Sequence, residues 1–186
     1  NKDSFVVELA SNDGYLLKNF VENDIPCLGI EPTKKTAEVA RNLGIPVDEV
    51  FFNNEVANKM SIANQKADLV IGNNVYAHVP DINDFTKGIA AILKTNGIVT
   101  LEFPHLLKLI KYNQFDTIYH EHFSYLSLHT VNRIFSNFGL KVFDVEEIDT
   151  HGGSLRVYGC LKDSKRMVTD NVKSKLELES NAGLQN

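Results

Sequence analysis

The sequence predicts an α/β fold, in which a mostly parallel seven-stranded sheet with an antiparallel last strand carries helices on both faces. Three observations predict it. Apolar strand-like runs alternate with amphipathic segments from the first residues onward, most of these runs are almost continuously apolar, and the last two follow one another with little helical potential between them. Continuous apolar strands separated by helices are typical of a parallel sheet that is buried on both faces, and a short connection suits an antiparallel pair.

Each expected strand is a short run rich in β-branched or aromatic residues. The strands are expected over residues 5–9, 27–30, 47–52, 67–72, 98–103, 140–148 and 154–161, with a turn at 95–97. Amphipathic spacing predicts the helices over residues 15–21, 33–43, 54–62, 81–93 and 127–138. Thr33 is a candidate N-cap, and Gly44 and Gly139 are natural helix stops. Five strand–helix units followed by a strand pair form the Rossmann-like layout of class I methyltransferases that use S-adenosylmethionine (SAM).

Composition places the chain among folded domains and limits its partners. The 186 residues are 43% hydrophobic and carry a net charge of −5, so one well-filled core is expected and nucleic-acid binding has no simple electrostatic support. No apolar stretch approaches the roughly 20 residues of a membrane span. Cys27 and Cys160 lie in apolar runs and are expected to be small buried thiols. Neither belongs to a C-x-x-C pair, and no disulfide framework is indicated, which favours a reducing, cytoplasmic compartment.

Polar residues follow the first, second and fourth expected strands, where an open α/β sheet binds its ligands. The turn after the first strand needs positions that tolerate positive φ, which Asn12 and Gly14 supply. Glu31 ends the second strand and can accept both ribose hydroxyls of an adenosine. Asn and Asp alone are common in ordinary turns, but three such features in register favour a ligand site. The residues expected to bind SAM are Glu8, Ala10, Ser11, Asn12, Asp13, Gly14, Glu31, Asn73 and Asn74.

Histidines gather in two segments that follow the fourth and fifth strands, over residues 74–80 and 115–123. His120 and His122 form an H-x-H pair that could share one face of an extended segment and bind a metal. The spacing suggests no third ligand, so no metal is expected. Histidines in loops also cap or bond the backbone without any catalytic function. Tyrosine, glutamate and histidine together beside a predicted SAM pocket favour general acid–base chemistry.

A third segment, Thr-His-Gly-Gly-Ser-Leu-Arg over residues 150–156, leads into the last strand. Its two glycines allow close approach of the backbone to a ligand or a neighbour, although an ordinary glycine-rich hairpin turn explains them equally well.

These motifs together resemble the deoxysugar C-methyltransferase family. The resemblance extends from about residue 5 to residue 160 and rests on residues 7–17, 29–32, 74–79, 115–122 and 150–156. Members of that family transfer methyl from SAM to the carbon next to the ketone of a nucleotide-linked deoxy-4-ketosugar. The resemblance implies that Tyr119, Glu121 and His122 are the active-site tyrosine, glutamate and histidine. It implies that His78 is a second active-site histidine, and it gives His120 no role.

The resemblance also implies a longer protein with three parts. An N-terminal zinc-binding domain, which supplies a further active-site tyrosine, and a C-terminal Rossmann-like domain would flank the SAM domain. We therefore expect one SAM-binding domain over residues 1–162 and a polar, helical linker or tail over residues 163–186 that begins the C-terminal domain.

The mechanism expected from this resemblance is methyl transfer to an enolate. His122 would remove the proton beside the ketone, Glu121 would orient His122, and Tyr119 and His78 would hold the enolate oxygen. Two alternatives remain: a SAM-dependent O- or N-methyltransferase of a small molecule, and a SAM- or nucleotide-binding module without chemistry. An NAD-dependent oxidoreductase is disfavoured, because the turn after the first strand has one glycine and not the G-x-G-x-x-G pattern.

Overall fold

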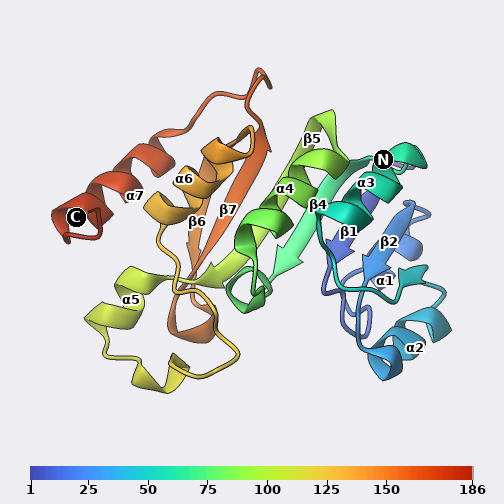
Figure 1. The fold of residues 1–186 in the computed structure, drawn as a ribbon, viewed down its shortest axis with the longest axis horizontal. Helices are drawn as coiled ribbons and strands as arrows, with labels where there is room; N and C mark the ends of the chain where they lie inside the picture. Colours follow the sequence, from blue (N-terminus) through green and yellow to red (C-terminus); the bar gives the residue numbers. More distant parts are fainter. Residues whose placement is uncertain (186) are drawn as a thin grey trace.

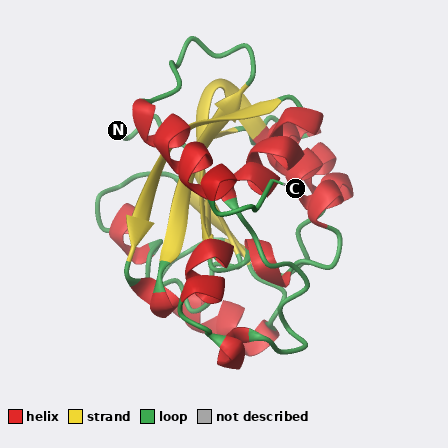
Figure 2. Ribbon diagram, turned by 90° about the vertical axis from the view of Figure 1, so that its left-hand side faces the viewer, coloured by secondary structure: helices red, strands yellow, loops and turns green. Residues whose placement is uncertain are grey.

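A computed structural model describes residues 1–185, which form one sheet with helices on both of its faces (Figures 1 and 2). The strands are β1 Val6–Leu9, β2 Cys27–Ile30, β3 Val47–Asp48, β4 Ala67–Asn73, β5 Leu93–Pro104, β6 Leu140–Ile148 and β7 Ser154–Leu161. The helices are α1 Lys18–Val21, α2 Lys34–Asn42, α3 Asn54–Ile62, α4 Ile82–Ile92, α5 Leu106–Lys111, α6 Leu128–Asn137 and α7 Asp170–Asn181. Three short 3₁₀ turns are η1 Tyr76–His78, η2 Phe115–Thr117 and η3 Thr150–Gly152.

The strand order is β3-β2-β1-β4-β5-β7-β6. All neighbouring pairs from β3 to β5 are parallel, and β7 runs antiparallel to both β5 and β6. The predicted fold class, including the antiparallel last strand, is confirmed. The chain reverses its direction of winding between β1 and β4, which is where open α/β sheets bind ligands at their carboxyl ends.

Two apolar cores lie on the two faces of the sheet. The larger core packs side chains of α3, α4, α6 and α7 against the sheet, and the smaller one packs α1 and α2 against β1 and β2. Tyr76 of η1 is fully buried in the larger core, where its hydroxyl lies 2.7 Å from the Thr86 hydroxyl and its ring contacts Phe85, Phe103 and Phe135. This anchor fixes the 3₁₀ turn that carries His78.

Local hydrogen bonds explain where three helices begin. Asn53, Asp81 and Ser127 each accept a backbone N–H of the first turn of α3, α4 and α6, as short polar N-cap residues do. Thr33 is the N-cap residue of α2, as predicted, but its side chain makes no capping bond. The amide of Thr33 instead donates to Glu31, which belongs to the site described below.

Three predicted elements differ from the structure, and one helix of the structure has no counterpart in the prediction. Helix α1 begins at Lys18 and not at residue 15, because Gly14 has a φ of +82° and Asp13 accepts the amide of Tyr15 in a turn. Strand β3 ends at Asp48 and not at residue 52. Residues 95–97, predicted as a turn, lie within β5, where the pairing with β4 is irregular. Helix α5 was not predicted.

Helix α5 belongs to a long excursion at the carboxyl edge of the sheet, here defined as residues 105–126. Its two ends are joined, because His105 and Leu126 form a parallel bridge and the amide of Leu106 donates to the carbonyl of Leu126 at 3.0 Å. In Figure 1 the excursion lies beyond the ends of β4 and β5, beside the turn between β6 and β7. All of the residues predicted from the 115–123 segment therefore belong to one closed loop.

The segment predicted as a polar tail contains α7, which packs on α6 and β6, so the predicted helix is confirmed. The domain boundary at residue 162 stays a prediction, and Asn186 lies outside the described residues. Glu179 of α7 is fully buried and accepts three hydrogen bonds, from His105 Nε2 at 2.8 Å and from the amides of Leu128 and His129 at 2.7 and 2.8 Å. Burial alone would raise the pKa of Glu179, but these bonds outweigh burial and lower it.

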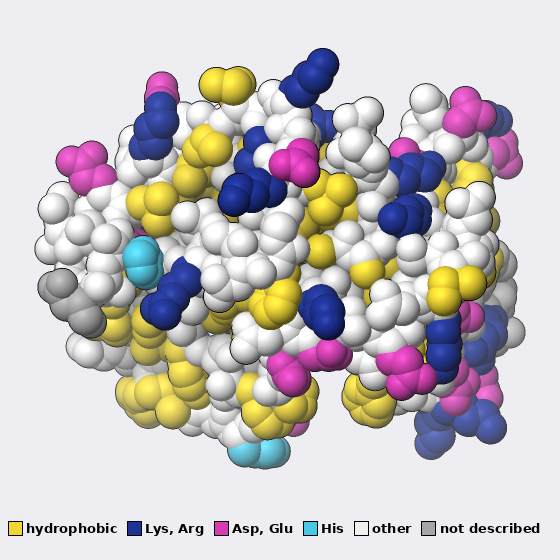
Figure 3. Space-filling view, turned by 45° about the horizontal axis from the view of Figure 1, so that its top comes forward, with side chains coloured by type: hydrophobic (Ala, Val, Ile, Leu, Met, Phe, Trp, Pro, Cys, Tyr) yellow, Lys and Arg dark blue, Asp and Glu magenta, His cyan; other side chains and the backbone are white. Residues whose placement is uncertain are grey.

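The surface of the described residues mixes charges of both signs. Lysine and arginine side chains are interspersed with aspartate and glutamate over the face shown in Figure 3. None of the helices within residues 1–185 combines the length and the apolar character needed to cross a bilayer.

We predict that Glu179→Ala lowers the free energy of unfolding by about 3 kcal/mol, because His105 and two helix N-terminal amides lose a buried partner. Urea denaturation of the parent protein measures this change. The control is Glu177→Ala, an exposed residue of the same helix, for which we expect a change within about 0.5 kcal/mol. Equal effects of the two substitutions would contradict the anchoring role of Glu179.

Candidate active site

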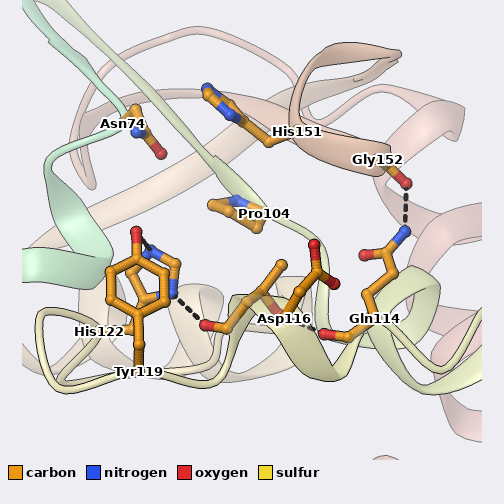
Figure 4. Close-up of a pocket in the computed structure, with 9 residues that line it drawn as sticks. Asn74, Pro104, Gln114, Asp116, Tyr119, His122, His151 and Gly152 are labelled. Carbon is orange, nitrogen blue, oxygen red and sulfur yellow. Dashed lines mark hydrogen bonds between the residues drawn. The ribbon is translucent and has the colours of Figure 1, made fainter.

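Three neighbouring cavities open at the carboxyl edge of the sheet. The strand-end cavity, of about 500 Å³, is polar and is lined by Glu8, Ala10, Asn12, Tyr15, Glu31, Thr33, Thr36, Asn73, Asn74 and His151. The histidine cavity, of about 360 Å³, is lined by Asn74, Pro104, Gln114, Asp116, Thr117, Tyr119, His122, His151 and Gly152 (Figure 4). The aromatic cavity, of about 570 Å³, is mostly apolar; Ala10, Pro32, Val50, Phe51, Phe52, Val75 and His78 are among the residues that line it.

Glu31 ties together the two turns that border the strand-end cavity. Its carboxylate accepts the amide of Asn12 at 3.1 Å through one oxygen and the amide of Thr33 at 2.8 Å through the other. Glu31 is only 6% exposed. Each carboxylate oxygen keeps further acceptor capacity, so a vicinal diol in the cavity can still donate to it.

Two polar atoms in the wall of the strand-end cavity are buried without a hydrogen-bond partner, Glu8 Oε2 and Asn74 Oδ1. Burial, and then the nearby negative charge of Asp13, raise the pKa of Glu8 to about 8. A buried acceptor without a donor is costly, so such atoms are typical of sites that a ligand completes. Together they offer acceptors to a ligand with ammonium or other N–H donors.

Six of the nine residues predicted to bind SAM line the strand-end cavity, and the other three shape its turn. Gly14 packs closely on Ala40 of α2 and on Ile45, where a Cβ atom would come within 3.1 Å and 2.3 Å of their side chains. Asp13 accepts the amide of Tyr15, and Ser11 is fully buried beside Gly29. Ser11, Asp13 and Gly14 therefore act on the cavity through the backbone of the turn.

Left-handed backbone is concentrated around these cavities. Four non-glycine residues that line them, Ala10, Asn12, Asn74 and His151, have φ between +51° and +56°. The sequence predicts this conformation for Asn12, since asparagine tolerates it. Alanine has no such preference, so the conformation of Ala10 carried no sequence signal. Strained backbone of this kind is typical of functional sites.

The aromatic cavity was not predicted. Phe51 and Phe52 were assigned to the third strand, but β3 ends at Asp48 and both side chains fall in the loop that lines this cavity. The Phe51 side chain is 79% exposed. Two consecutive phenylalanines just after a short strand are the sequence feature that could have indicated this cavity. The cavity suits a flat, apolar ring.

His122 and Tyr119 face the histidine cavity, and the backbone orients His122. The Nδ1 atom of His122 lies 2.7 Å from the carbonyl oxygen of Thr117, so Nδ1 carries the proton and donates it. Nε2 is the other ring nitrogen, and the Tyr119 hydroxyl lies 3.3 Å from it. The two rings are 4.4 Å apart. An imidazole whose Nδ1 donates to the backbone accepts a proton through Nε2 when its ring is neutral.

Glu121 is expected to orient His122, and His78 is expected to hold the enolate oxygen; the structure shows the following contacts for these two residues. No hydrogen bond joins the Glu121 carboxylate to His122 among the described residues, and the Thr117 carbonyl makes the orienting contact instead. Glu121 is exposed, and its carbonyl oxygen accepts His78 Nδ1 at 3.1 Å. The His78 ring lies 4.6 Å from the His122 ring and lines the aromatic cavity. Burial, and then the charge of His122, lower the pKa of His78.

His120 is exposed and lines none of the three cavities. Within residues 1–185, no three His, Cys, Asp or Glu side chains gather in an arrangement that could hold a metal ion. Cys27 and Cys160 are buried and unpaired, as predicted.

Comparison with known proteins identifies the domain. Residues 1–145 match the methyltransferase domain family. The chain belongs to that family. The methyltransferase domain has the Rossmann-like fold of the SAM-dependent class, and SAM is its cofactor. The C-methyltransferase NovU of Streptomyces niveus is 37% identical to it over 179 residues, which are 96% of this chain and 43% of NovU. The methyltransferase domain thus spans less than half the length of this curated relative.

Solved structures agree with the fold of the methyltransferase domain. A SAM-dependent methyltransferase of Thermotoga maritima, described as a possible histamine N-methyltransferase, superposes with a TM-score of 0.66 at 16% identity, over 87% of this chain and 83% of that one. Magnesium protoporphyrin IX methyltransferase of Synechocystis, crystallised with bound SAM, superposes with a TM-score of 0.61 at 12% identity, over 84% and 69% of the two chains. At such identities the likeness concerns the fold alone.

We predict that Glu8→Gln stabilises the ligand-free protein at pH 8 by about 4 kcal/mol. The unfolded chain ionises Glu8 near pH 4.5, whereas the folded chain holds the proton to about pH 8. The wild type therefore loses stability, relative to the variant, as the pH rises between these values. Denaturation at pH 4.5 and pH 8 measures the difference, which should vanish at the lower pH.

The control for this prediction is Glu22→Gln, because Glu22 is exposed. Its stability relative to the wild type should not depend on pH in this range. A Glu8→Gln effect of the same size at both pH values would show that Glu8 is already ionised in the folded protein.

Proposed function

We propose that this domain, within its parent protein, transfers the methyl group of SAM to the carbon beside the ketone of a nucleotide-linked deoxy-ketosugar. One observation carries the proposal: His122, held at Nδ1 by the backbone, presents Nε2 to a cavity that directly adjoins the strand-end cavity. The printed description of NovU as a C-methyltransferase supports the same chemistry.

Methylation of carbon requires a base in the site. SAM, when bound, supplies a methyl group on a positively charged sulfur, which only an electron-rich atom accepts. A sugar carbon becomes electron-rich when the proton beside a ketone is removed. His122 Nε2 is the base in this proposal, and the Thr117 carbonyl keeps its Nδ1 protonated. O- and N-methylation also use a base but form no enolate, so the methylated atom of the product separates these alternatives.

The cavities divide the binding of SAM among them in this proposal. The aromatic cavity would take the adenine ring between Phe51 and Val75, and Glu31 would accept the ribose hydroxyls. Glu8 and Asn74, with their unpartnered buried oxygens, would accept the ammonium of the methionine part. The adenine, the ribose hydroxyls and the ammonium of SAM would each meet side chains of complementary chemistry. The residues of this chain therefore fit the cofactor of the family.

Tyr119, His78 and Glu121 have supporting roles in this proposal. The Tyr119 hydroxyl, 3.3 Å from His122 Nε2, holds the base in place until substrate enters. His78 packs its ring against His122, and the Glu121 carbonyl oxygen orients His78. The resemblance to deoxysugar C-methyltransferases implies an active-site role for all three residues. The contacts described above are consistent with a role in positioning His122.

The proposed parent protein is larger than this domain and lies in the cytoplasm. The coverage of 43% of NovU leaves room for the flanking zinc-binding and C-terminal domains that the resemblance implies. Two buried, unpaired cysteines are in keeping with a reducing compartment.

We predict that Phe51→Ala in the parent protein weakens SAM binding about tenfold, since stacking of a base on an aromatic ring is worth about 1–3 kcal/mol. The melting temperature should not change, because the Phe51 side chain is 79% exposed. Calorimetry measures the affinity. Ile62→Ala, at a position that is 87% exposed and lines none of the three cavities, should bind SAM like the wild type. Unchanged SAM affinity in the Phe51→Ala variant would contradict the proposed placement of adenine in the aromatic cavity.

We predict that His122→Ala lowers both methyl transfer and solvent hydrogen exchange at the substrate carbon by about 10²-fold or more, while SAM affinity is kept. Mass spectrometry of the sugar in heavy water follows the exchange, and product analysis follows the methylated atom. His120→Ala is the control, since His120 lies in the same loop outside the cavities. Normal exchange in the His122→Ala variant would exclude His122 as the base.

A further inference from the structure

His151 lies on the wall between the strand-end cavity and the histidine cavity. Asn74 and His151 are the two described residues that line both cavities. Figure 4 shows Asn74 and His151 on one side of the histidine cavity, with Tyr119 and His122 on the opposite side. A methyl group that moves from the first cavity to the second passes this boundary.

The backbone of the turn that carries His151 is held in a strained conformation. His151 has a φ of +53° and is followed by Gly152 and Gly153 at +75° and +115°. A non-glycine residue in this region costs about 1 kcal/mol or more, so the surrounding contacts must hold it there.

Three hydrogen bonds hold this turn. The Thr150 hydroxyl donates to Glu102 at 2.8 Å, Gln114 Nε2 donates to the Gly152 carbonyl at 2.7 Å, and the His105 amide donates to the Gly153 carbonyl at 3.1 Å. Glu102 is itself only 7% exposed and is paired with Arg156. The turn is therefore fixed to β5 and to the excursion. The His151 ring, in contrast, has no hydrogen-bond partner within residues 1–185, and its nitrogens are free for a ligand.

An enolate needs a hydrogen-bond donor at its oxygen, and most donors in the histidine cavity are already engaged. The Tyr119 hydroxyl faces His122, the Thr117 hydroxyl donates to the Gln114 carbonyl, and Gln114 donates to Gly152. His78 lines the aromatic cavity and donates to the Glu121 carbonyl. The His151 imidazole and the Asn74 amide remain, and Asn74 also belongs to the strand-end cavity.

We propose that His151 is a further catalytic residue, whose ring N–H donates a hydrogen bond to the enolate oxygen opposite the His122 base. This inference rests on the proposed function. His122 Nε2 takes the proton from the carbon, the electrons of the C–H bond form a C=C bond, and the C=O π electrons move to the oxygen. His151 keeps its proton throughout. The carbon then bonds to the methyl group, the C=O bond re-forms, and the sulfur retains the electron pair of its former bond to methyl.

The position of His151 also fits electrostatically. Besides burial, a positive charge on His122 or, to a lesser extent, on His151 lowers the pKa of His78, so the three imidazoles lie within electrostatic reach of one another. A cluster of this kind favours a negative charge among its members, which is what the enolate oxygen introduces.

The test compares the wild-type parent protein with His151→Ala and His151→Asn. Asparagine adopts left-handed backbone readily and keeps an N–H donor, so it separates loss of the hydrogen bond from loss of the turn. Asn64→Ala is the matched control, because Asn64 is exposed, has a φ of +60° and lies outside the cavities. Three quantities are measured with a nucleotide-linked 4-ketosugar: solvent hydrogen exchange at the carbon, single-turnover methyl transfer, and SAM affinity by calorimetry.

We expect His151→Ala to slow exchange and transfer together by about 10²-fold, with SAM affinity within about twofold of the wild type. His151→Asn should recover part of both rates, and Asn64→Ala should match the wild type. Unchanged exchange in His151→Ala, or a loss of SAM affinity alone, would overturn the inference and leave the proposed function intact. Absence of both exchange and C-methylation in the wild type would overturn the proposed function, and the inference with it.

Discussion

The site depends on one carboxylate, that of Glu31. Its two oxygens accept backbone amides from two separate turns, after β1 and after β2, and so fix the distance between the strand ends that border the strand-end cavity. Without this contact, Asn12 would have little reason to hold its left-handed backbone at φ +54°. Hydrogen bonds within the protein thus hold the walls of the cavity in place, which reduces the ordering cost of binding. The same residue that would recognise the ligand builds the walls around it.

Much of the fold follows from the sequence, because strand and helix periodicities agree with the tertiary structure. The alternation of apolar runs and amphipathic segments predicts every strand, and the β-pair near the end predicts the antiparallel last strand. Strand β3 was overextended because Phe51 and Phe52 suit a strand by composition, and only tertiary structure turns them toward a cavity. Helix α5 is six residues long with no buried residue, so its amphipathic signal was weak.

The sequence predicts which residues line the site better than it predicts the contacts that orient them. Glu8, Asn12, Glu31 and Asn74 follow from their places at strand ends, and these four side chains line one cavity. The orientation of His122 is different, because a backbone carbonyl, that of Thr117, determines it. Every residue has a backbone carbonyl, so a contact to one cannot be predicted from residue types. A side-chain partner such as Glu121 is what a sequence suggests, and here the backbone takes its place.

The buried, unpartnered carboxyl of Glu8 has a consequence for cofactor uptake. In the proposed binding mode, the ammonium and sulfonium of the ligand lie beside Glu8 and lower its pKa from about 8, so that the carboxyl releases its proton as the ligand binds. Binding of the cofactor is then coupled to the release of one proton from Glu8. The apparent association constant for the cofactor would therefore increase with pH up to the pKa of Glu8, about 8. The heat of association would vary with the ionisation enthalpy of the buffer that collects the proton.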